Sequence, residues 1–322
     1  MYEKFYGLSA MPFQLTPDAR FFYEAKGHSR ANAHLHYGLA QGEGFIVITG
    51  EVGTGKTTLV ERLLTEPDFQ RYSVARVSTT QVSGDDLLRL AMAGFGIEEE
   101  GIGKAALLRR FEAVLRQASE EARRCLLIVD EVQNLPTAAL EELRMLSNLA
   151  GSDRGVLQTL LVGQPQFRAI LARPDLDQLR QRVLASYHLG PMTSAETRAY
   201  VEHRMRAVGW TGSSPQWDDG AFAAIYDHTS GVPRRINRLC SRVLLYGALD
   251  ESPVINGPMV ETTADELQQD LEAGADMVSV KAPLPVAVEG DDLVHRVEAL
   301  EHAMARREQV FQRLSSILGT TR

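Results

Sequence analysis

The sequence predicts an α/β fold: a parallel sheet of five strands between helices, followed by a small all-helical domain. Three observations lead to this prediction. Five short apolar runs alternate with helical periodicity, turn or helix signals bound each run, and the strand signals stop after residue 190. Strands that alternate with helices form parallel sheets covered on both faces. We expect the strands at Phe45–Thr49, Ser73–Val77, Leu126–Val129, Leu157–Val162 and Ala185–Leu189.

The expected helices carry apolar residues at helical spacing and have recognisable start signals. Ser83 and Asp86 form a capping-box pattern ahead of one helix, and Thr193 and Glu196 form another just after the last strand. Another helix of the C-terminal group begins at Pro233, because proline is tolerated in the first turn of a helix. These signals place helices between the strands and throughout the domain that follows them.

Composition divides the chain into five expected parts. An aromatic-rich N-terminal segment packs on the α/β core, and a helical domain, which we call the lid, follows the core. An acidic and then Pro-, Val- and Ala-rich linker comes next, and after it an amphipathic helix with heptad spacing. That helix either packs back on the lid or forms a coiled coil or partner-docking helix. The expected ranges are 1–40 for the N-terminal segment, 41–190 for the core, 191–268 for the lid, 269–290 for the linker and 291–319 for the amphipathic helix.

The charge balance and cysteine count exclude several classes of protein. The chain has 322 residues and a formal net charge of −8, which argues against a nucleic-acid coat protein because phosphate neutralisation needs clustered cations. Its two cysteines, Cys125 and Cys240, lie in separate apolar runs and are expected to be core residues in a reducing compartment. We find no signal-peptide pattern and no apolar stretch of roughly 18 residues, so we expect a cytoplasmic protein.

A glycine-rich loop directly follows the first expected strand and opens a helix. Its spacing, Gly, four residues, then Gly-Lys-Thr, is that of a phosphate-binding loop. Glycines let the backbone N–H groups point at phosphate oxygens, and the positive end of the next helix adds to the field. Lys56 would supply a point charge to the β- and γ-phosphates, and the Thr57 hydroxyl would ligate Mg²⁺. The expected nucleotide-binding residues here are Gly50, Glu51, Val52, Gly53, Thr54, Gly55, Lys56, Thr57 and Thr58.

Two carboxylates end the third expected strand. Asp130 and Glu131 follow the apolar run Leu126–Val129, so they emerge at the carboxyl edge of the sheet, where ligands of such folds bind. Asp130 is expected to hold the Mg²⁺ shell, and Glu131 to polarise the attacking water. The alternative is a strand that simply ends at an acidic turn without binding a ligand. The phosphate-binding loop in the same chain argues against it.

Three further polar residues are candidates for the same site. Gln164 follows the fourth strand and is expected to sense the γ-phosphate or the water, unless it only shapes the turn before Pro165. Arg182, favoured over Arg180, precedes the fifth strand and could reach a neighbouring subunit's nucleotide; such a finger accelerates hydrolysis by about 10³- to 10⁵-fold. The alternative for Arg182 is a solvated helix face.

The lid contributes Arg234, in the segment Gly231–Arg235 that opens its third helix. From there a guanidinium could swing onto the phosphates and report the nucleotide state. Arg235, Arg238 and Arg242 continue along this helix, either as a solvated face or as a basic patch for nucleic acid. His28 and the aromatic N-terminal segment are candidate neighbours of the adenine base.

Several stretches, most of them outside the phosphate-binding loop and the carboxylate pair, resemble those of a known protein family. They are Met1–Leu8, Pro12–Asp18, Gly42–Gly50, Glu141–Asn148, Gln178–Val183, Tyr187–Pro191 and Gly231–Asn237. Over about residues 1–270 the chain resembles the ExeA/GspA-like AAA ATPases, and more narrowly the ATPase encoded beside exosortase (PEP-CTERM) and exopolysaccharide loci.

The resemblance implies a P-loop AAA+ fold with ATP and Mg²⁺ as cofactors. It gives Lys56, Thr57, Asp130 and Glu131 the Walker A and Walker B roles, Arg182 the finger role and Arg234 the lid-sensor role. It also implies a homo-oligomeric ring or arc, acting as motor or switch for a cell-envelope secretion or exopolysaccharide system and peripheral to the inner membrane through its partners. Secretion-type relatives often carry a membrane span and a peptidoglycan-binding module after the ATPase; we expect only a linker and a heptad helix here.

Two alternatives remain open at this point. One is a DNA-binding AAA+ regulator of the transposition or replication-loader kind, which shares the core architecture; the acidic charge and the lack of a recognisable winged helix count against it. The other is a nucleotide-gated scaffold that hydrolyses slowly and signals through its C-terminal helix.

Overall fold

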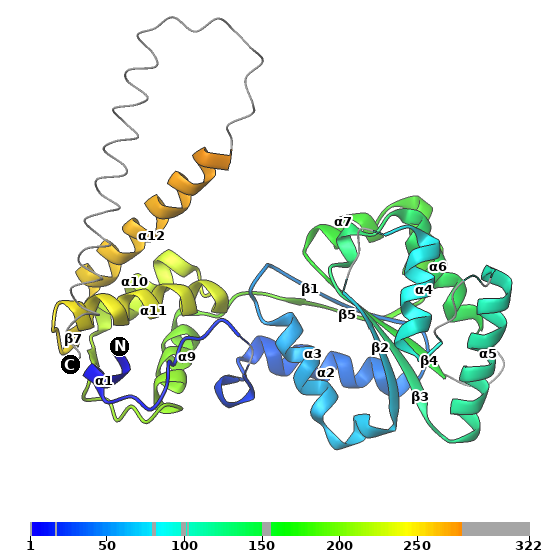
Figure 1. The fold of residues 1–322 in the computed structure, drawn as a ribbon, viewed down its shortest axis with the longest axis horizontal. Helices are drawn as coiled ribbons and strands as arrows, with labels where there is room; N and C mark the ends of the chain where they lie inside the picture. The colour runs from blue at the N-terminus through cyan, green and yellow to red at the C-terminus, as the bar shows by residue number, and fades with distance from the viewer. Residues whose placement is uncertain are drawn as a thin grey trace, which may run out of the picture. The chain divides into compact units, whose positions relative to one another are not determined.

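Five parallel strands form the central sheet, in the spatial order β2-β3-β4-β1-β5 (Figure 1). The computed structural model describes residues 2–16, 18–78, 82–97, 101, 103–149 and 156–278. All five predicted strands are confirmed, with slightly different ends. The bounds are β1 Phe45–Gly50, β2 Tyr72–Val77, β3 Arg124–Val129, β4 Leu157–Gly163 and β5 Val183–Leu189.

Side chains of the central strands alternate between two apolar layers. On β1, Phe45 and Val47 enter one hydrophobic cluster, whereas Ile46 and Ile48 enter the cluster on the opposite face. Successive side chains of a strand point to opposite faces of the sheet, so a strand buried on both faces is apolar throughout. All four of these side chains are nearly inaccessible to solvent. This double burial fixes the position of the strand ends, where the loop and the carboxylates lie.

Helices cover both faces of the sheet. Figure 1 shows α2 and α3 on one side, and α4, α5 and α6 on the other. The helices of the core are α2 Lys26–Gln41, α3 Lys56–Thr65, α4 Gly84–Gly94, α5 Lys104–Glu120, α6 Thr137–Leu149, α7 Gln166–Leu171 and α8 Asp177–Arg180. Short 3₁₀ helices connect some of them: η1 Ala19–Phe21, η2 Pro67–Arg71, η3 Val132–Asn134 and η4 Pro174–Leu176. The chain therefore has the predicted layered α/β architecture.

Predicted start signals mark several of these helices. The Ser83 hydroxyl caps α4 by accepting from the Asp86 amide at 3.2 Å. At the start of α9 (Ser194–Arg206), the Thr193 hydroxyl accepts from the Glu196 amide, and the Glu196 carboxylate accepts from the Thr193 amide at 2.9 Å. This reciprocal pair is a complete capping box. The sequence signals at both helix starts are confirmed.

The lid follows the sheet and consists mainly of helices. Its helices are α9, α10 Asp219–Thr229, α11 Pro233–Leu249 and the start of α12 Gly257–Val278. It also contains a two-stranded parallel pair, β6 Gln216–Trp217 and β7 Val254–Ile255, which corrects the expectation of an all-helical domain. Strands of two residues are too short to produce an alternating pattern that sequence reading can detect.

Helix α12 extends further than the sequence suggested. It runs through Val278, into the range 269–290 that we expected to be a linker. The residues between Glu266 and Ala275 are rich in Leu, Ala, Glu and Gln, which all favour helix, and this outweighs the acidic charge that we read as a linker signal. Residues 279–290 and the predicted amphipathic helix 291–319 lie outside the described residues.

The N-terminal segment is shared between the lid and the sheet. Tyr2 and Tyr6 of α1 (Tyr2–Tyr6) enter the hydrophobic cluster of the lid together with Phe13 and Phe21. Helix α2 instead packs on the sheet through Ala31, Leu35 and Leu39. The expectation that residues 1–40 pack on the α/β core therefore holds for α2, whereas the aromatic part lies on the lid. A lid of a few short helices needs this extra apolar surface to bury its own core.

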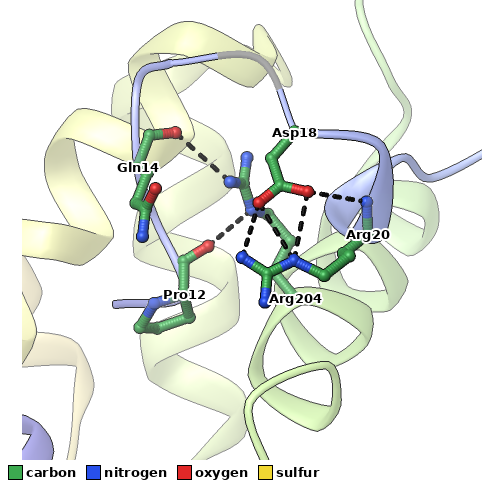
Figure 2. Close-up of polar contacts among 5 residues, drawn as sticks. All are labelled: Pro12, Gln14, Asp18, Arg20 and Arg204. Atoms are coloured by element: carbon green, nitrogen blue, oxygen red, sulfur yellow. Dashed lines mark hydrogen bonds and ion pairs between the residues drawn. The ribbon is translucent and has the colours of Figure 1, made fainter. Parts of the chain in front are cut away.

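A buried arginine holds the N-terminal segment on the lid. The Arg204 guanidinium, on α9, donates to the Pro12 carbonyl at 2.6 Å and to the Gln14 carbonyl at 3.2 Å (Figure 2). A third bond reaches the Tyr200 hydroxyl at 2.8 Å, and the guanidinium carbon lies 4.7 Å from the centroid of the Phe21 ring. Only 5% of Arg204 is exposed. Carbonyl dipoles and an aromatic face therefore replace the water that a buried cation loses.

The remaining class predictions concern cysteines and membrane spans. Cys125 and Cys240 are both free and buried, as expected of core residues, and burial raises the pKa of Cys125 to about 11. Among the helices of the described residues, none combines the length and hydrophobicity of a membrane span.

We predict that Arg204→Ala detaches the N-terminal segment from the lid. The substitution leaves a buried carbonyl, a partly buried carbonyl and the Tyr200 hydroxyl without their donor, so the free energy of unfolding should fall by about 3 kcal/mol. Urea unfolding measures this loss, and limited proteolysis should cleave within residues 2–16 before the core. The matched control is Arg206→Ala on the same helix, whose exposed pair with Glu202 contributes little. Equal stability of the two variants would contradict the role of Arg204.

Candidate nucleotide-binding site

The glycine-rich loop connects β1 to α3 with two left-handed glycines. Gly53 has φ +86° and Gly55 has φ +96°, a region that residues with side chains rarely adopt. A Cβ on Gly53 would lie 2.4 Å from the Arg234 Cβ, and one on Gly55 would lie 2.9 Å from the His28 Nε2. Both positions therefore require glycine for conformation and for space. The loop curls as the phosphate-binding pattern predicts.

Lys56, the first residue of α3, directly follows this loop and is almost completely buried. Its ammonium donates to the carbonyls of Gly50 at 2.8 Å and Glu51 at 2.9 Å. Burial lowers the pKa of Lys56, while the charges of Glu131, Asp130 and Glu51 oppose that shift. A lysine ammonium has three donors, and loop carbonyls use two of them. The third can serve an anion in the cradle.

The carboxylate pair reaches the same edge of the sheet. β3 ends at Val129, and Asp130 follows it with one carboxylate oxygen accepting from the Glu131 amide at 3.0 Å. The other oxygen lies 3.5 Å from the Thr57 hydroxyl. The two expected metal ligands, Thr57 and Asp130, are thus neighbours. Hydroxyl and carboxylate oxygens are the donors that Mg²⁺ prefers, so this pair fits that ion.

An amide network holds the Glu131 carboxylate. Gln133 donates to its Oε2 at 2.6 Å and Gln164 donates to the same oxygen at 3.0 Å. The Gln133 carbonyl oxygen in turn accepts from the Gln164 backbone amide at 2.9 Å. Burial alone would raise the pKa of Glu131, but these amide donors and the Lys56 charge outweigh it and hold that pKa below its usual value. The predicted contact residue Gln164 therefore lies beside Glu131, together with a glutamine that sequence reasoning missed.

The Glu131 backbone lies in the left-handed region with φ +51°. A non-glycine residue there is strained by about 1–3 kcal/mol and persists only where its surroundings impose it. Such residues concentrate at functional sites. The turn directs the Glu131 side chain to the cavity described below, whereas a regular continuation of β3 would carry it elsewhere.

Arg76 is a second residue that sequence reasoning missed. Its guanidinium lies 3.0 Å from the Asp130 Oδ2 and 3.6 Å from a carboxylate oxygen of Glu61 on α3. Residue 76 thus faces the α3 side of the edge strand β2. Only the alternation of β2 could have indicated this, because the pairing of β2 with β3 brings Arg76 next to Asp130.

The lid reaches the loop through the first turn of α11. The Arg234 backbone amide donates to the Gly53 carbonyl at 3.2 Å, and its side chain lines the same cavity as Lys56 and Glu131. Arg182 lies elsewhere: it is half-buried and donates to the Ser147 hydroxyl on α6 at 2.8 Å. The structure thus brings Arg234 to the loop, and Arg182 is not among the residues that line the cavity.

A cavity of about 340 Å³ adjoins the loop. Its lining includes residues of the phosphate-binding loop, Glu131 and Arg234, residues of the N-terminal segment, and lid residues such as Met192 and Tyr200. The lining from the N-terminal segment and α2 consists of Gln14, Leu15, Thr16, Asp18, Phe21, Phe22, Tyr23 and His28. A lining that combines charged side chains with aromatic and apolar ones suits a ligand that has both phosphates and a planar ring. His28 and the aromatic segment therefore line the expected cavity.

Comparison with known proteins agrees with this geometry. A family model described as an AAA domain matches residues 39–171. The chain is 36% identical over 246 residues to general secretion pathway protein A of Aeromonas hydrophila; the match covers 76% of this chain and 44% of that protein. The chain therefore spans less than half the length of this relative.

Solved structures share the fold at low sequence identity. The ORC2 protein of Aeropyrum pernix has 18% identity and a TM-score of 0.59, covering 80% of this chain and 72% of that chain. Cdc6p of Pyrobaculum aerophilum has 17% identity and a TM-score of 0.58, covering 78% and 71%. The chain thus has the P-loop AAA+ fold, carries an AAA domain and is related in sequence to general secretion pathway protein A.

We predict that the stability difference between the wild type and Glu131→Gln depends on pH. The folded-state pKa of Glu131 is lowered, so its ionised carboxylate stabilises the fold at neutral pH. That contribution is lost as the pH falls below the usual glutamate pKa of about 4.3 and through the lower folded value. Urea unfolding of both proteins should show that the free energy of unfolding of the wild type falls relative to that of Glu131→Gln as the pH becomes acidic. A difference that stays constant would contradict the amide network.

Proposed function

We propose that the chain binds Mg-ATP in this cavity and hydrolyses it to ADP and phosphate. The observation that carries the proposal is the convergence of Lys56, the Thr57–Asp130 pair and Glu131 at one sheet edge. Phosphoryl transfer needs positioning and charge stabilisation more than covalent chemistry, and these groups supply both. The AAA domain match and the similarity to general secretion pathway protein A support the same activity.

Each residue has a separate proposed task. Backbone amides of Gly50–Thr58 and the Lys56 ammonium hold the phosphates, and Arg234 approaches them from the lid. Thr57 and Asp130 would hold Mg²⁺, which would supply charge neutralisation for the phosphates. Glu131 orients the attacking water and draws its proton.

Two glutamines support Glu131 in this scheme. Gln164 has the proposed task of sensing the γ-phosphate: it directly follows β4 and its amide donates to the Glu131 carboxylate. Gln133 acts as a positioning residue, since it bonds both the Glu131 carboxylate and the Gln164 backbone. In this scheme hydrolysis stops whenever the bonds from Gln133 and Gln164 keep the Glu131 carboxylate from contacting the attacking water.

We infer that the ATPase works as a motor or switch in a cell-envelope secretion system. The similarity to general secretion pathway protein A supports this setting, and the narrower sequence resemblance favours an exosortase-associated exopolysaccharide system. In this proposal the protein is a homo-oligomeric ring or arc in the cytoplasm that reaches the inner membrane through its partners. Affinity capture of the Glu131→Gln protein in ATP, with mass spectrometry of what co-purifies, tests it; capture of no envelope component would count against it.

We predict that Lys56→Ala and Glu131→Gln fail in different ways. Loss of the ammonium removes the main charge for the phosphates, so Lys56→Ala should weaken ATP binding by at least about a hundredfold. Glu131→Gln should bind ATP normally and hydrolyse it at least about a hundredfold more slowly, because only the base is lost. Fluorescent-nucleotide titration and phosphate release measure the two effects. Lys104→Ala, a half-buried ion-pair residue on α5 that does not line the cavity, is the control; equal loss of affinity in both site variants would overturn the assignment.

We predict that Arg182→Ala reduces turnover only in the assembled protein. In its own subunit Arg182 bonds Ser147 and does not line the cavity, so the finger hypothesis places its effect on hydrolysis at a neighbouring site. Phosphate release should be measured above and below the assembly concentration determined by light scattering. Arg180→Ala is the matched control, because Arg180 is exposed and pairs with Asp177. Equal loss of turnover in verified monomer would show that Arg182 is not a finger.

A further inference from the structure

His28 is a buried histidine that contacts the phosphate-binding loop at Thr54 and Gly55. It lies in the first turn of α2, is 6% exposed and has the Phe22 ring edge-on at 5.9 Å between centroids. Its ring lines the cavity beside Gly55. The residue precedes β1 in the chain, so it belongs neither to the loop nor to the carboxylate pair. It contacts the loop from outside.

The contact fixes which ring nitrogen carries the proton. Nε2 lies 3.2 Å from the Thr54 carbonyl oxygen, which can only accept, so Nε2 is the protonated nitrogen. Burial lowers the pKa of His28, against the opposing effects of that bond and of the Glu196 and Glu24 charges, which favours the neutral ring. Nδ1 is buried and has no partner among the residues that the structure describes. Hydrogen bonding by this ring therefore goes to the loop.

The bond to Thr54 also fixes the direction of the next amide. Ser214–Pro215 is the cis peptide of the described chain, so the peptide between Thr54 and Gly55 is trans. In a trans peptide the C=O and the N–H point in opposite directions. With the Thr54 carbonyl turned towards His28, the Gly55 N–H is turned away from it.

Other contacts of the loop leave this peptide unrestrained. Lys56 and the Thr54 hydroxyl both bond carbonyls nearer the start of the loop, and the Gly55 carbonyl accepts from the Leu59 amide of α3. Glycine populates positive and negative φ about equally, so the backbone preference of Gly55 does not by itself fix the orientation of this peptide plane. His28 supplies the restraint that the glycine itself lacks.

We propose that His28 is a positioning residue that pre-orients the Thr54–Gly55 peptide for phosphate. It holds the carbonyl dipole out of the cradle and directs the Gly55 N–H into it, so phosphate binding does not require the loop to reorganise first. This inference rests on the proposed nucleotide site. It differs from the expectation of an adenine neighbour, because the affinity that depends on His28 comes from the phosphates and not from the base.

The experiment compares two substitutions that separate the hydrogen bond from packing. His28→Phe keeps an aromatic ring against Phe22 and removes the donor, whereas His28→Gln places an amide N–H near the position of Nε2. His28→Phe should weaken ADP binding by about tenfold and His28→Gln by less than about threefold. His34→Phe, a more exposed position on the same helix, should leave ADP affinity unchanged. Calorimetric titration of ADP and of inorganic tripolyphosphate measures all four proteins.

The two ligands distinguish the outcomes. Equal fold-losses for ADP and tripolyphosphate in His28→Phe support the proposal, and a loss confined to ADP overturns it in favour of a base contact. Equal losses in His28→Phe and His28→Gln overturn it in favour of packing. Wild-type protein that binds neither ligand refutes the nucleotide site itself, which is a different result.

A measurement on the unmodified protein removes any dependence on the folding of variants. Long-range ¹⁵N–¹H correlation of histidine-labelled protein reports the tautomer of each ring. The proposal requires His28 to carry its proton on Nε2, and a proton on Nδ1 overturns it.

Discussion

The site depends on one constraint of the sheet: β3, β4 and β1 end at the same edge in adjacent positions. The glycine-rich loop follows β1, and Asp130 and Glu131 follow β3. β4 lies between them and ends beside Gln164. Because these strands are close-packed between two helix layers, a shift in register would misfit their side chains on both faces. The rigid core therefore fixes the distance between a cation and two carboxylates.

Charge at this edge is balanced by pairing. Lys56 is stabilised by loop carbonyls and nearby carboxylates, and Asp130 by Arg76 and the Glu131 amide. An unpaired buried charge would cost several kcal/mol, so each of these groups needs its partner before any ligand arrives. Glu131 accepts from the side-chain amides of Gln133 and Gln164, and the nearby Lys56 charge also favours its ionised form. These contacts keep the carboxylate ionised at neutral pH, which a group that accepts a proton from water requires.

The sequence predicted the parts of the fold that are encoded locally. Continuous apolar runs indicated the five strands, and Thr193 with Glu196 indicated the start of α9. The glycine spacing identified the loop because its backbone geometry demands those glycines. Arg76, Gln133 and Arg204 escaped notice because each acquires its partner only through tertiary structure. Arg204 in particular looks in sequence like one more polar residue of an amphipathic helix.

Hydrogen bonds between residues far apart in the sequence hold the N-terminal segment, the lid and the phosphate-binding loop around one cavity. Arg204 ties the N-terminal segment to the lid, and the Arg234 amide ties the lid to the loop at Gly53. A ligand in the cavity would touch all three segments, so its binding free energy depends on the contacts that hold them together. Conversely, a ligand that contacts the lid more strongly in one arrangement than in another shifts the lid towards that arrangement. Arg204 therefore couples the two segments: movement of α9 carries the N-terminal segment with it, because separating them would leave the buried guanidinium without its carbonyl partners.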